Sequence, residues 1–304
     1  ALSNRNLIYN GAMQVAQRGT SFTITSGGGY SLDRFYAQSD VGSGHTWAQV
    51  SDVPSSSGFE YSGKVTVGTG ATPSGSNFGR LIYYVEGYDA QQTCFGSSDA
   101  KAVTLSFWTK SSVAGTFGGS IKMQFASPFS GFFFTYTINA TNTWEHKTVT
   151  IPAGTITGGS MSGSNGIGLL VAFDLGEGPD RSTSAGYQAS PSGGVLGVTG
   201  ATKILATSSA TWQITGLQLE LGTEATPFEY RTFADELARC QRYFCQPFDG
   251  VATHSAMGVG RGAGGGAVVV WSVIAPVPMR TTPTMTSSGS YYITDSTSRT
   301  IATP

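Results

Sequence analysis

Apolar and polar residues alternate over much of the chain between positions 103 and 175. In "VTLSFWTK", Val103, Leu105 and Phe107 occupy every second position, and "IKMQF", "KTVTIP" and "IGLLVAFDL" repeat the pattern. A period of two places the apolar side chains on one face of a strand. Turn clusters such as "AGTFGG" and "TGGSMSGSNG" separate these runs. The pattern predicts an all-β fold of short antiparallel strands stacked as a β-sandwich, rather than an α/β fold.

The last apolar run of this unit, "TWQITGLQLEL", changes parity once. Trp212 and Ile214 share one parity, whereas Leu217 and Leu219 continue on the other. Gly216 lies at the switch, and an extra residue in a strand lets both sets of side chains face the same side. The sequence therefore predicts a β-bulge at Gly216.

The period then changes to that of a helix. Thr232, followed by Asp235, matches the start of a capped helix. Acidic residues occupy the first turn and arginines the last, which suits the helix dipole. An apolar stripe runs through Phe233, Leu237, Cys240 and Phe244. The pattern predicts one short helix over 233–244, which must dock its stripe on the open end of the sandwich or on the same helix of another subunit.

A second β pattern follows the helix. "AVVVWSVI" and "SYYITD" are typical of strands, and "APVPMRTTPTMTSSG" between them is extended and punctuated by proline. These patterns divide the chain into a sandwich over 1–230, a connecting helix over 231–247 and a small β domain over 248–304. The last unit is short enough to depend on partners for its core.

Composition narrows the function classes. Only 12% of the residues are charged and the net charge is −1, which argues against a nucleic-acid or anionic-membrane binder. No apolar run approaches the ~20 residues of a membrane span, and no signal peptide precedes "NRNLIYNG". We therefore expect a soluble protein made in a cytosol, with Cys94, Cys240 and Cys245 as reduced thiols.

Motifs for catalysis or metal binding are scarce. The Gly-x-Ser-x-Gly elbow is absent, and His45, His146 and His254 lack the spacing of zinc ligands. "GRGAGG" precedes a strand rather than a helix, so a flexible turn fits better than a phosphate loop. "DLGEGPDR" groups acids around glycines, as in a calcium loop or an ordinary polar turn. We expect no catalytic residue, metal or cofactor; the acids to test first would be Asp33, Glu60, Glu86, Asp89 and Asp174.

Glycan binding needs aromatic faces for sugar C–H surfaces, with polar groups around them. "YYVEGYD" supplies Tyr84, Tyr88, Glu86 and Asp89 within a few residues, and Trp47 adds another ring. These five are the predicted ligand-binding residues. The alternative is that aromatic residues at alternating positions fill the core. The remaining aromatic candidates are Tyr83, Trp108, Trp144, Phe132 and Tyr136.

Several blocks together resemble tail-fibre and receptor-binding proteins of tailed bacteriophages. They include "NRNLIYNGAMQVAQRG", "YYVEGYDAQQTCFGSSDAKAVTLSFWTKSS" and "ITGLQLELGTEATPFEYRTFADELARCQRYF", and they cover most of residues 4–285. "NLIYNGAMQ" and "ITGLQLELG" also resemble the first and last strands of carbohydrate-binding jelly-roll modules. Those modules often hold calcium through a carboxylate just after the Asn-Gly turn, where this chain has Gln14. The resemblance implies a jelly roll without supporting a calcium site.

The resemblance further implies a homotrimeric virion protein, made in the bacterial cytoplasm, that contacts other phage tail or virion proteins and a bacterial surface polysaccharide. Three linked copies would raise the avidity of weak sugar binding. The expected function is thus a tail-fibre or receptor-binding component that acts without catalysis. The first alternative is a head or tail decoration or adaptor protein that binds only other virion subunits. The second is a polysaccharide depolymerase.

Overall fold

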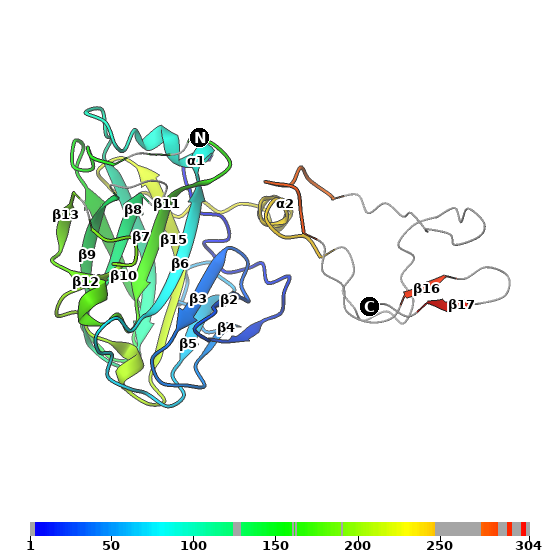
Figure 1. The fold of residues 1–304 in the computed structure, drawn as a ribbon, viewed down its shortest axis with the longest axis horizontal. Coiled ribbons are helices and arrows are strands. Elements are labelled where there is room, and N and C mark those ends of the chain that lie inside the picture. The colour runs from blue at the N-terminus through cyan, green and yellow to red at the C-terminus, as the bar shows by residue number, and fades with distance from the viewer. Residues whose placement is uncertain are drawn as a thin grey trace.

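The computed structural model describes residues 4–123, 129–159, 161, 163–189, 191–246, 275–284, 291–293 and 299–301. Two large antiparallel sheets stack face to face as a jelly-roll β-sandwich, and the helix α2 (Phe233–Gln241) lies beside it (Figure 1). The predicted fold class, an all-β jelly roll followed by a short helix, is confirmed. No helix within the described ranges is long and apolar enough to cross a membrane.

The first sheet has six strands in the order β1-β4-β5-β15-β7-β10, with every neighbouring pair antiparallel. The predicted strands "VTLSFWTK" and "KTVTIP" are β7 and β10, and they pair with Leu105 opposite Val149. The bounds are β1 (Ser21–Thr23), β4 (Thr46–Val50), β5 (Ser62–Thr66), β15 (Thr211–Leu221), β7 (Val103–Ser111) and β10 (Glu145–Ile151).

The second sheet has seven strands in the order β13-β9-β8-β11-β6-β3-β2, also antiparallel throughout. It contains the predicted strands "IKMQF" in part and "IGLLVAFDL". The bounds are β13 (Gly186–Gln188), β9 (Ser130–Ile138), β8 (Gly115–Met123), β11 (Ile167–Asp174), β6 (Gly79–Glu86), β3 (Phe35–Ser39) and β2 (Gly29–Tyr30).

Smaller elements connect or follow the two sheets. The predicted strand "SYYITD" contains β16, which pairs with β17, whereas "AVVVWSVI" lies outside the described residues. The bounds are β12 (Ser182–Thr183), β14 (Gly197–Val198), β16 (Tyr291–Ile293), β17 (Arg299–Ile301), α1 (Gly87–Ala90) and the 3-10 turns η1 (Gln91–Thr93), η2 (Pro179–Arg181) and η3 (Ile204–Ala206).

The core fills the space between the two sheets because alternate residues of each strand face inward. On β6, Leu81, Tyr83 and Val85 are each 1% exposed and belong to the main core cluster. Tyr84 points the opposite way and packs in a separate cluster on the outer face of the second sheet. The largest fully buried side chains of the main core are Trp47, Trp212, Tyr83, Phe35 and Phe107.

The predicted bulge in β15 is confirmed. The register with β7 shifts between Thr215 and Gln218, and Gly216 has a φ of 62°. That left-handed conformation is easily adopted only by glycine. Ile214 before the bulge and Leu217 after it are both 0% exposed. Because of the one extra residue, the apolar side chains before the bulge and those after it all face the core.

The helix α2 begins where the cap predicts. The Thr232 hydroxyl accepts a hydrogen bond from the Asp235 N–H at 3.2 Å. The helix ends at Gln241, three residues before the predicted end. The predicted apolar stripe is wrong at its start, because Phe233 is 56% exposed whereas Glu236 is 7% exposed. The first turn of α2 is held by polar contacts rather than by apolar burial.

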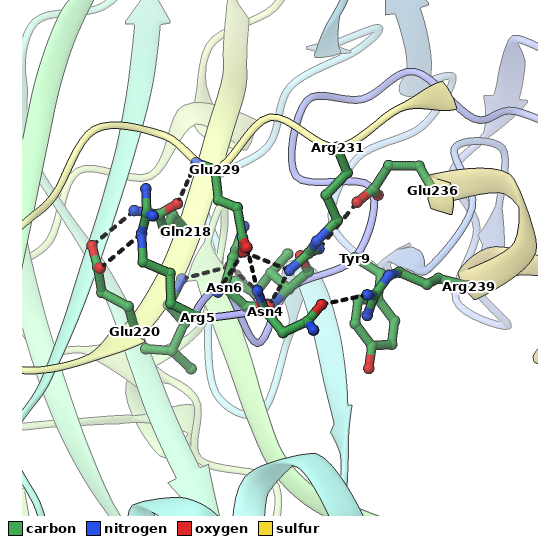
Figure 2. Close-up of polar contacts among 12 residues, drawn as sticks. Asn4, Arg5, Asn6, Tyr9, Gln218, Glu220, Glu229, Arg231, Glu236 and Arg239 are labelled. Carbon is green, nitrogen blue, oxygen red and sulfur yellow. Dashed lines mark hydrogen bonds and ion pairs between the residues drawn. The ribbon is translucent and has the colours of Figure 1, made fainter. Parts of the chain in front are cut away.

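These polar contacts form a network among the N-terminal segment, the end of β15 and α2 (Figure 2). Arg231 donates to Glu236 Oε1 at 3.0 Å, to Glu229 Oε2 at 2.8 Å and to the carbonyl of Asn6 at 2.6 Å. The Asn6 side chain in turn accepts from the Leu219 N–H at 3.0 Å. Residues more than 200 positions apart thus fix where the helix leaves the sandwich.

The chain after α2 returns to the sandwich. Arg280 donates its backbone N–H to the carbonyl of Arg242 at 2.9 Å and its Nη1 to the carbonyl of Asn165 at 2.7 Å. The Asn165 amide donates back to the Arg280 carbonyl at 2.8 Å. This segment therefore contacts the first unit, and the predicted division at 247/248 stays a prediction.

Candidate ligand-binding cleft

A cleft of about 500 Å³ lies on the outer face of the second sheet. Its sheet side carries Tyr30 of β2, Tyr36 and Gln38 of β3 and Tyr84 of β6. The opposing side comes from the turn after α2, from the start of β11 with the two residues before it, and from the segment after residue 275. These contribute Tyr243, Phe244, Asn165, Gly166, Ile167 and Arg280. The volume falls within the ~300–1,000 Å³ of small-ligand sites.

The tyrosines reach the cleft because of strand parity and a short glycine run. Phe35 and Ala37 face the core, so Tyr36 and Gln38 face outward. The rings of Tyr30 and Tyr36 pack with centroids 5.1 Å apart. A Cβ at Gly28, whose φ is 69°, would lie 2.2 Å from the Tyr36 hydroxyl. Because Gly28 has no side chain, the Tyr36 ring can occupy this position without a steric clash.

Two arginines of the sandwich stack on the rings of the turn after α2. The guanidinium carbon of Arg18 lies 3.4 Å from the centroid of Phe244, and that of Arg34 lies 3.4 Å from the centroid of Tyr243. Arg34 also donates to the Tyr84 carbonyl and to the Tyr83 hydroxyl. Cation–π contacts of this kind stabilise by ~0.5–2 kcal/mol each. These contacts hold Tyr243 and Phe244, which we call the aromatic wall of the cleft, over the sheet.

Glu86 also binds the turn after α2 to the sandwich. Its carboxylate accepts from Arg242 Nη2 at 2.6 Å, from Arg242 Nε at 3.0 Å and from the Tyr243 hydroxyl at 2.6 Å. Burial would raise the pKa of Glu86, but the donors from Arg242 and Tyr243 outweigh it and hold that pKa below its usual value. Both carboxylate oxygens are engaged, so Glu86 acts as a positioning residue for the wall.

Asp33 is the second carboxylate that lines the cleft, and it is 1% exposed. It accepts from the Gln17 side chain and from the Gln17 N–H at 3.2 Å, and Arg18 lies 3.5 Å away. Burial raises the pKa of Asp33 although these partners oppose the rise. Burial likewise raises the pKa of Tyr84 to about 12. Tyr84 is therefore a neutral hydrogen-bonding ring at physiological pH.

The structure brings together only part of the predicted ligand-binding set. Tyr84 and Glu86 line the cleft. Tyr88, on α1, is 54% exposed outside the cleft lining, and Asp89 accepts a hydrogen bond from the Tyr9 hydroxyl at 2.7 Å. The prediction for Trp47 needs correction, because its side chain is 0% exposed. The ring fills the core beneath Gly63, where a Cβ would lie 2.0 Å from it, and has no face for a sugar.

The other aromatic candidates lie elsewhere. Tyr83 and Tyr136 are buried in the core. Trp108 packs against His146 on the first sheet with the rings tilted by 54° and their centroids 5.2 Å apart, and Trp144 donates to Asp52 at 3.2 Å. Sequence reasoning missed Tyr30, Tyr36, Tyr243 and Phe244. The outward parity of Tyr36 relative to Phe35 was the available signal for the strand residues; the turn after α2 offered none.

Asp174, Glu177 and His45 have structural partners, whereas Glu60 is exposed. Asp174 pairs with Lys203, and Glu177 pairs with Arg80 at 2.6 Å. The His45 ring accepts from the Gly68 N–H at 3.1 Å and contacts the Val41 carbonyl at 2.5 Å, whereas His254 lies outside the described residues. Within the described ranges, no three His, Cys, Asp or Glu side chains are grouped as a metal site. The three cysteines are free thiols, as predicted.

No protein-family model matches the chain, and no curated protein matches it by sequence. Among solved structures, it is similar to the enzymatically active domain of tailspike protein 4 of bacteriophage CBA120, with 13% identity and a TM-score of 0.37. That match covers 72% of this chain, which spans only 22% of the tailspike chain.

Two carbohydrate-binding modules are also similar. The family 11 module from Clostridium thermocellum has 12% identity and a TM-score of 0.34, over 68% of this chain and 99% of the module. The CBM22-1 xylan-binding domain from Paenibacillus barcinonensis has 11% identity and a TM-score of 0.33, over 74% and 99%. At these identities and TM-scores the comparisons assign neither a family nor a ligand to this chain.

Proposed function

We propose that the chain binds a glycan in the cleft between the second sheet and the turn after α2. The observation that carries the proposal is the grouping of Tyr30, Tyr36, Tyr84, Tyr243 and Phe244 around one cavity of about 500 Å³. Aromatic faces suit the C–H surfaces of sugar rings, and polar groups at the rim suit their hydroxyls. Gln38 and Asn165 supply amides at this rim.

The binding is proposed to proceed without catalysis. Asp33 and Glu86 are the carboxylates in the described lining of the cleft, and the oxygens of both already accept hydrogen bonds from within the protein. A glycosidase needs two carboxyl groups that face the scissile bond. A depolymerase is the alternative, and its test is the release of reducing sugar from host polysaccharide. If the protein releases reducing sugar and Asp33→Asn or Glu86→Gln abolishes that release, the proposal of non-catalytic binding is wrong and the protein is a depolymerase.

We further propose that the protein is a tail-fibre or receptor-binding component of a phage virion that contacts a bacterial surface polysaccharide. The support is the order and combination of sequence blocks shared with such proteins across most of residues 4–285. A decoration or adaptor protein would bind virion subunits only. Antibody labelling of intact particles separates the two: label at the fibre tips supports the receptor-binding role, and label on the head or tail tube supports decoration.

Homotrimer formation is part of the same proposal. Tyr230 is 52% exposed and Phe233 is 56% exposed, at the start of the connecting helix. These two rings supply apolar surface that a second copy of the chain would cover in the proposed trimer. Sedimentation of the full chain should give a trimer at micromolar concentration, and Phe233→Ser should weaken it. A stable monomer of the unmodified chain would contradict the trimer.

The glycan proposal is tested on an array of bacterial surface oligosaccharides, followed by calorimetry of the best one. Tyr84→Ala removes a ring from the cleft and should weaken binding about 10- to 30-fold, or ~1.5–2 kcal/mol. Tyr88→Ala is the matched control, since it removes an exposed tyrosine from outside the cleft lining. Gln38→Ala tests the rim with less risk to folding. Equal binding by all variants, or loss only in Tyr88→Ala, would show that the cleft is not the site.

A further inference from the structure

Three guanidinium groups converge on one ring inside the cleft. Arg18, Arg34 and Arg280 all line the cavity together with Tyr30. The guanidinium carbon of Arg18 lies 5.0 Å from the Tyr30 centroid. Burial raises the pKa of the Tyr30 hydroxyl, and the positive charges of Arg34, Arg18 and Arg280 each oppose that rise. The positive charges of the three arginines therefore all act on the Tyr30 hydroxyl.

The carboxylates of the cleft do not balance these cations. Glu86 is engaged by Arg242, which adds a fourth guanidinium beside the cavity, and Asp33 lies 3.5 Å from Arg18. Among the residues that the structure describes, neither Arg34 nor Arg280 forms an ion pair with a carboxylate, although the charge of Arg34 also acts on Asp33 and Glu86. The lining alone, with three guanidinium groups and two carboxylates, has a formal charge of about +1 at neutral pH, and Arg242 beside it raises this to about +2.

Within the described ranges, the hydrogen bonds of these two arginines go to neutral oxygens. Arg34 donates from Nε and Nη2 to Tyr83 and Tyr84, and Arg280 donates from Nη1 to the Asn165 carbonyl. In the described part of the chain, Arg34 Nη1 and Arg280 Nη2 have no hydrogen-bond partner. Stacking on an aromatic ring uses the flat face of a guanidinium and leaves its N–H edges free. Each arginine therefore keeps donors for an anion.

The backbone at Arg34 supports a functional reason for its position. Its φ is 77°, in the left-handed region that a residue with a long side chain rarely adopts. Such strain persists where the surrounding fold fixes it, often at ligand sites. Here it places a cation between Tyr83, Tyr84 and Tyr243. Clamping the turn alone would not require a site with excess positive charge.

We propose that the cleft binds an acidic glycan, whose anionic substituent occupies the space between Arg34 and Arg280 while a neighbouring sugar ring contacts Tyr30 or Tyr84. This inference rests on the proposed glycan binding and adds its ligand class. The planar fork of donors on arginine matches carboxylate and phosphate oxygens. The anion is thus a uronic-acid carboxylate or a phosphate of the polysaccharide backbone.

The test uses matched oligosaccharides with the full chain. The probes are glucuronic-acid-containing hexasaccharides, the same hexasaccharides after reduction of the carboxyl groups to hydroxymethyl groups, and a phosphodiester-linked oligosaccharide. Calorimetry should give an affinity about tenfold or more higher for an acidic probe than for its reduced form, and the difference should shrink as salt rises. Preference for the phosphodiester probe would identify phosphate as the anion.

Single substitutions test whether the preference for the acidic probe depends on the arginines of the cleft. Arg280→Gln and Arg34→Gln should each remove most of the preference for the acidic probe while binding of the reduced probe changes less than threefold. Lys101→Gln removes an exposed cation that is not part of the lining and is the matched control. Arg34→Gln can loosen the stack on Tyr243, so Arg280→Gln and the comparison of wild-type probes test the inference without it.

The outcomes separate the two proposals. Binding of acidic and reduced probes with equal affinity would overturn the acidic-glycan inference and leave glycan binding standing. A lack of binding to neutral and acidic glycans alike would overturn both. An acidic preference that persists in Arg280→Gln and Arg34→Gln but falls in Lys101→Gln would place the anion outside the cleft and overturn the inference.

Discussion

The ion pair between Glu86 and Arg242 connects β6 to the turn after α2, and its loss should release that turn from the sandwich. Two N–H···O contacts of 2.6 and 3.0 Å join the side chains, and the Tyr243 hydroxyl adds a third donor at 2.6 Å. The Glu86 side chain is 2% exposed and that of Arg242 is 33% exposed. The pair is therefore intermediate between a surface pair and a buried one.

The magnitude follows from this partial burial. Exposed pairs couple by ~0.2–1 kcal/mol, whereas removal of one partner from a buried pair costs ~3–5 kcal/mol. After allowance for the solvent around Arg242, we expect a coupling energy of about 2 kcal/mol between Glu86→Gln and Arg242→Gln. The pair closes the wall of the cleft, so Glu86→Gln should also weaken glycan binding.

The assay is a double-mutant cycle read by hydrogen exchange in the turn after α2. The N–H groups of Tyr243 and Phe244 donate to the Cys240 carbonyl at 2.9 and 3.1 Å, and they report on the opening of this turn. A loss of 2 kcal/mol accelerates their exchange about 30-fold, while the core strands exchange as before. The control cycle uses the more exposed pair of Lys110 and Asp52, for which we expect less than ~1 kcal/mol. A coupling below ~0.5 kcal/mol for Glu86 and Arg242 would refute the reasoning.

Three further predictions concern stability. Gly216→Ala should lower the free energy of unfolding in urea by about 2–4 kcal/mol, because the φ is 62° and a Cβ would lie 2.5 Å from an aromatic ring; an unchanged midpoint would contradict it. Burial raises the pKa of Glu145, but donors from Lys147 and the turn at 139–140 lower it to about 2. Stability from this depressed pKa is present above pH ~4.5 and is lost as pH falls toward 2, so Glu145→Gln should flatten the acid limb of a pH-dependent unfolding series by ~1 kcal/mol. Thr232→Ala should cost about 1 kcal/mol at the N-terminus of α2, seen as faster amide exchange in its first turn.

Local patterns were sufficient for the strands and for the start of the helix. Strand parity depends on neighbours two positions apart, so the sequence predicted β7, β10 and the bulge at Gly216. A cap depends on residues three positions apart, so it predicted the start of α2 at Phe233. These features follow from the geometry of a few bonded residues and need no knowledge of distant contacts.

The same local patterns could not separate a core ring from a surface ring. Trp47 and Tyr84 both lie in short strands, yet one is 0% exposed and the other lines the cleft. Which face of a strand is inner depends on where the second sheet packs. The exposed Phe233 was mistaken for a docking residue for a similar reason, because an ion pair between Arg231 and Glu236 sets how α2 leaves the sandwich.

The sequence by itself determined the strand periods, the bulge, the helix cap and two cleft residues, Tyr84 and Glu86. Only the tertiary structure decided that a cleft exists, since its walls come from segments far apart in the chain. Glu86 meets Arg242 across 156 positions, and Arg18 meets Phe244 across a longer separation still. Contacts of this kind depend on how whole sheets and helices pack, and no local pattern encodes them.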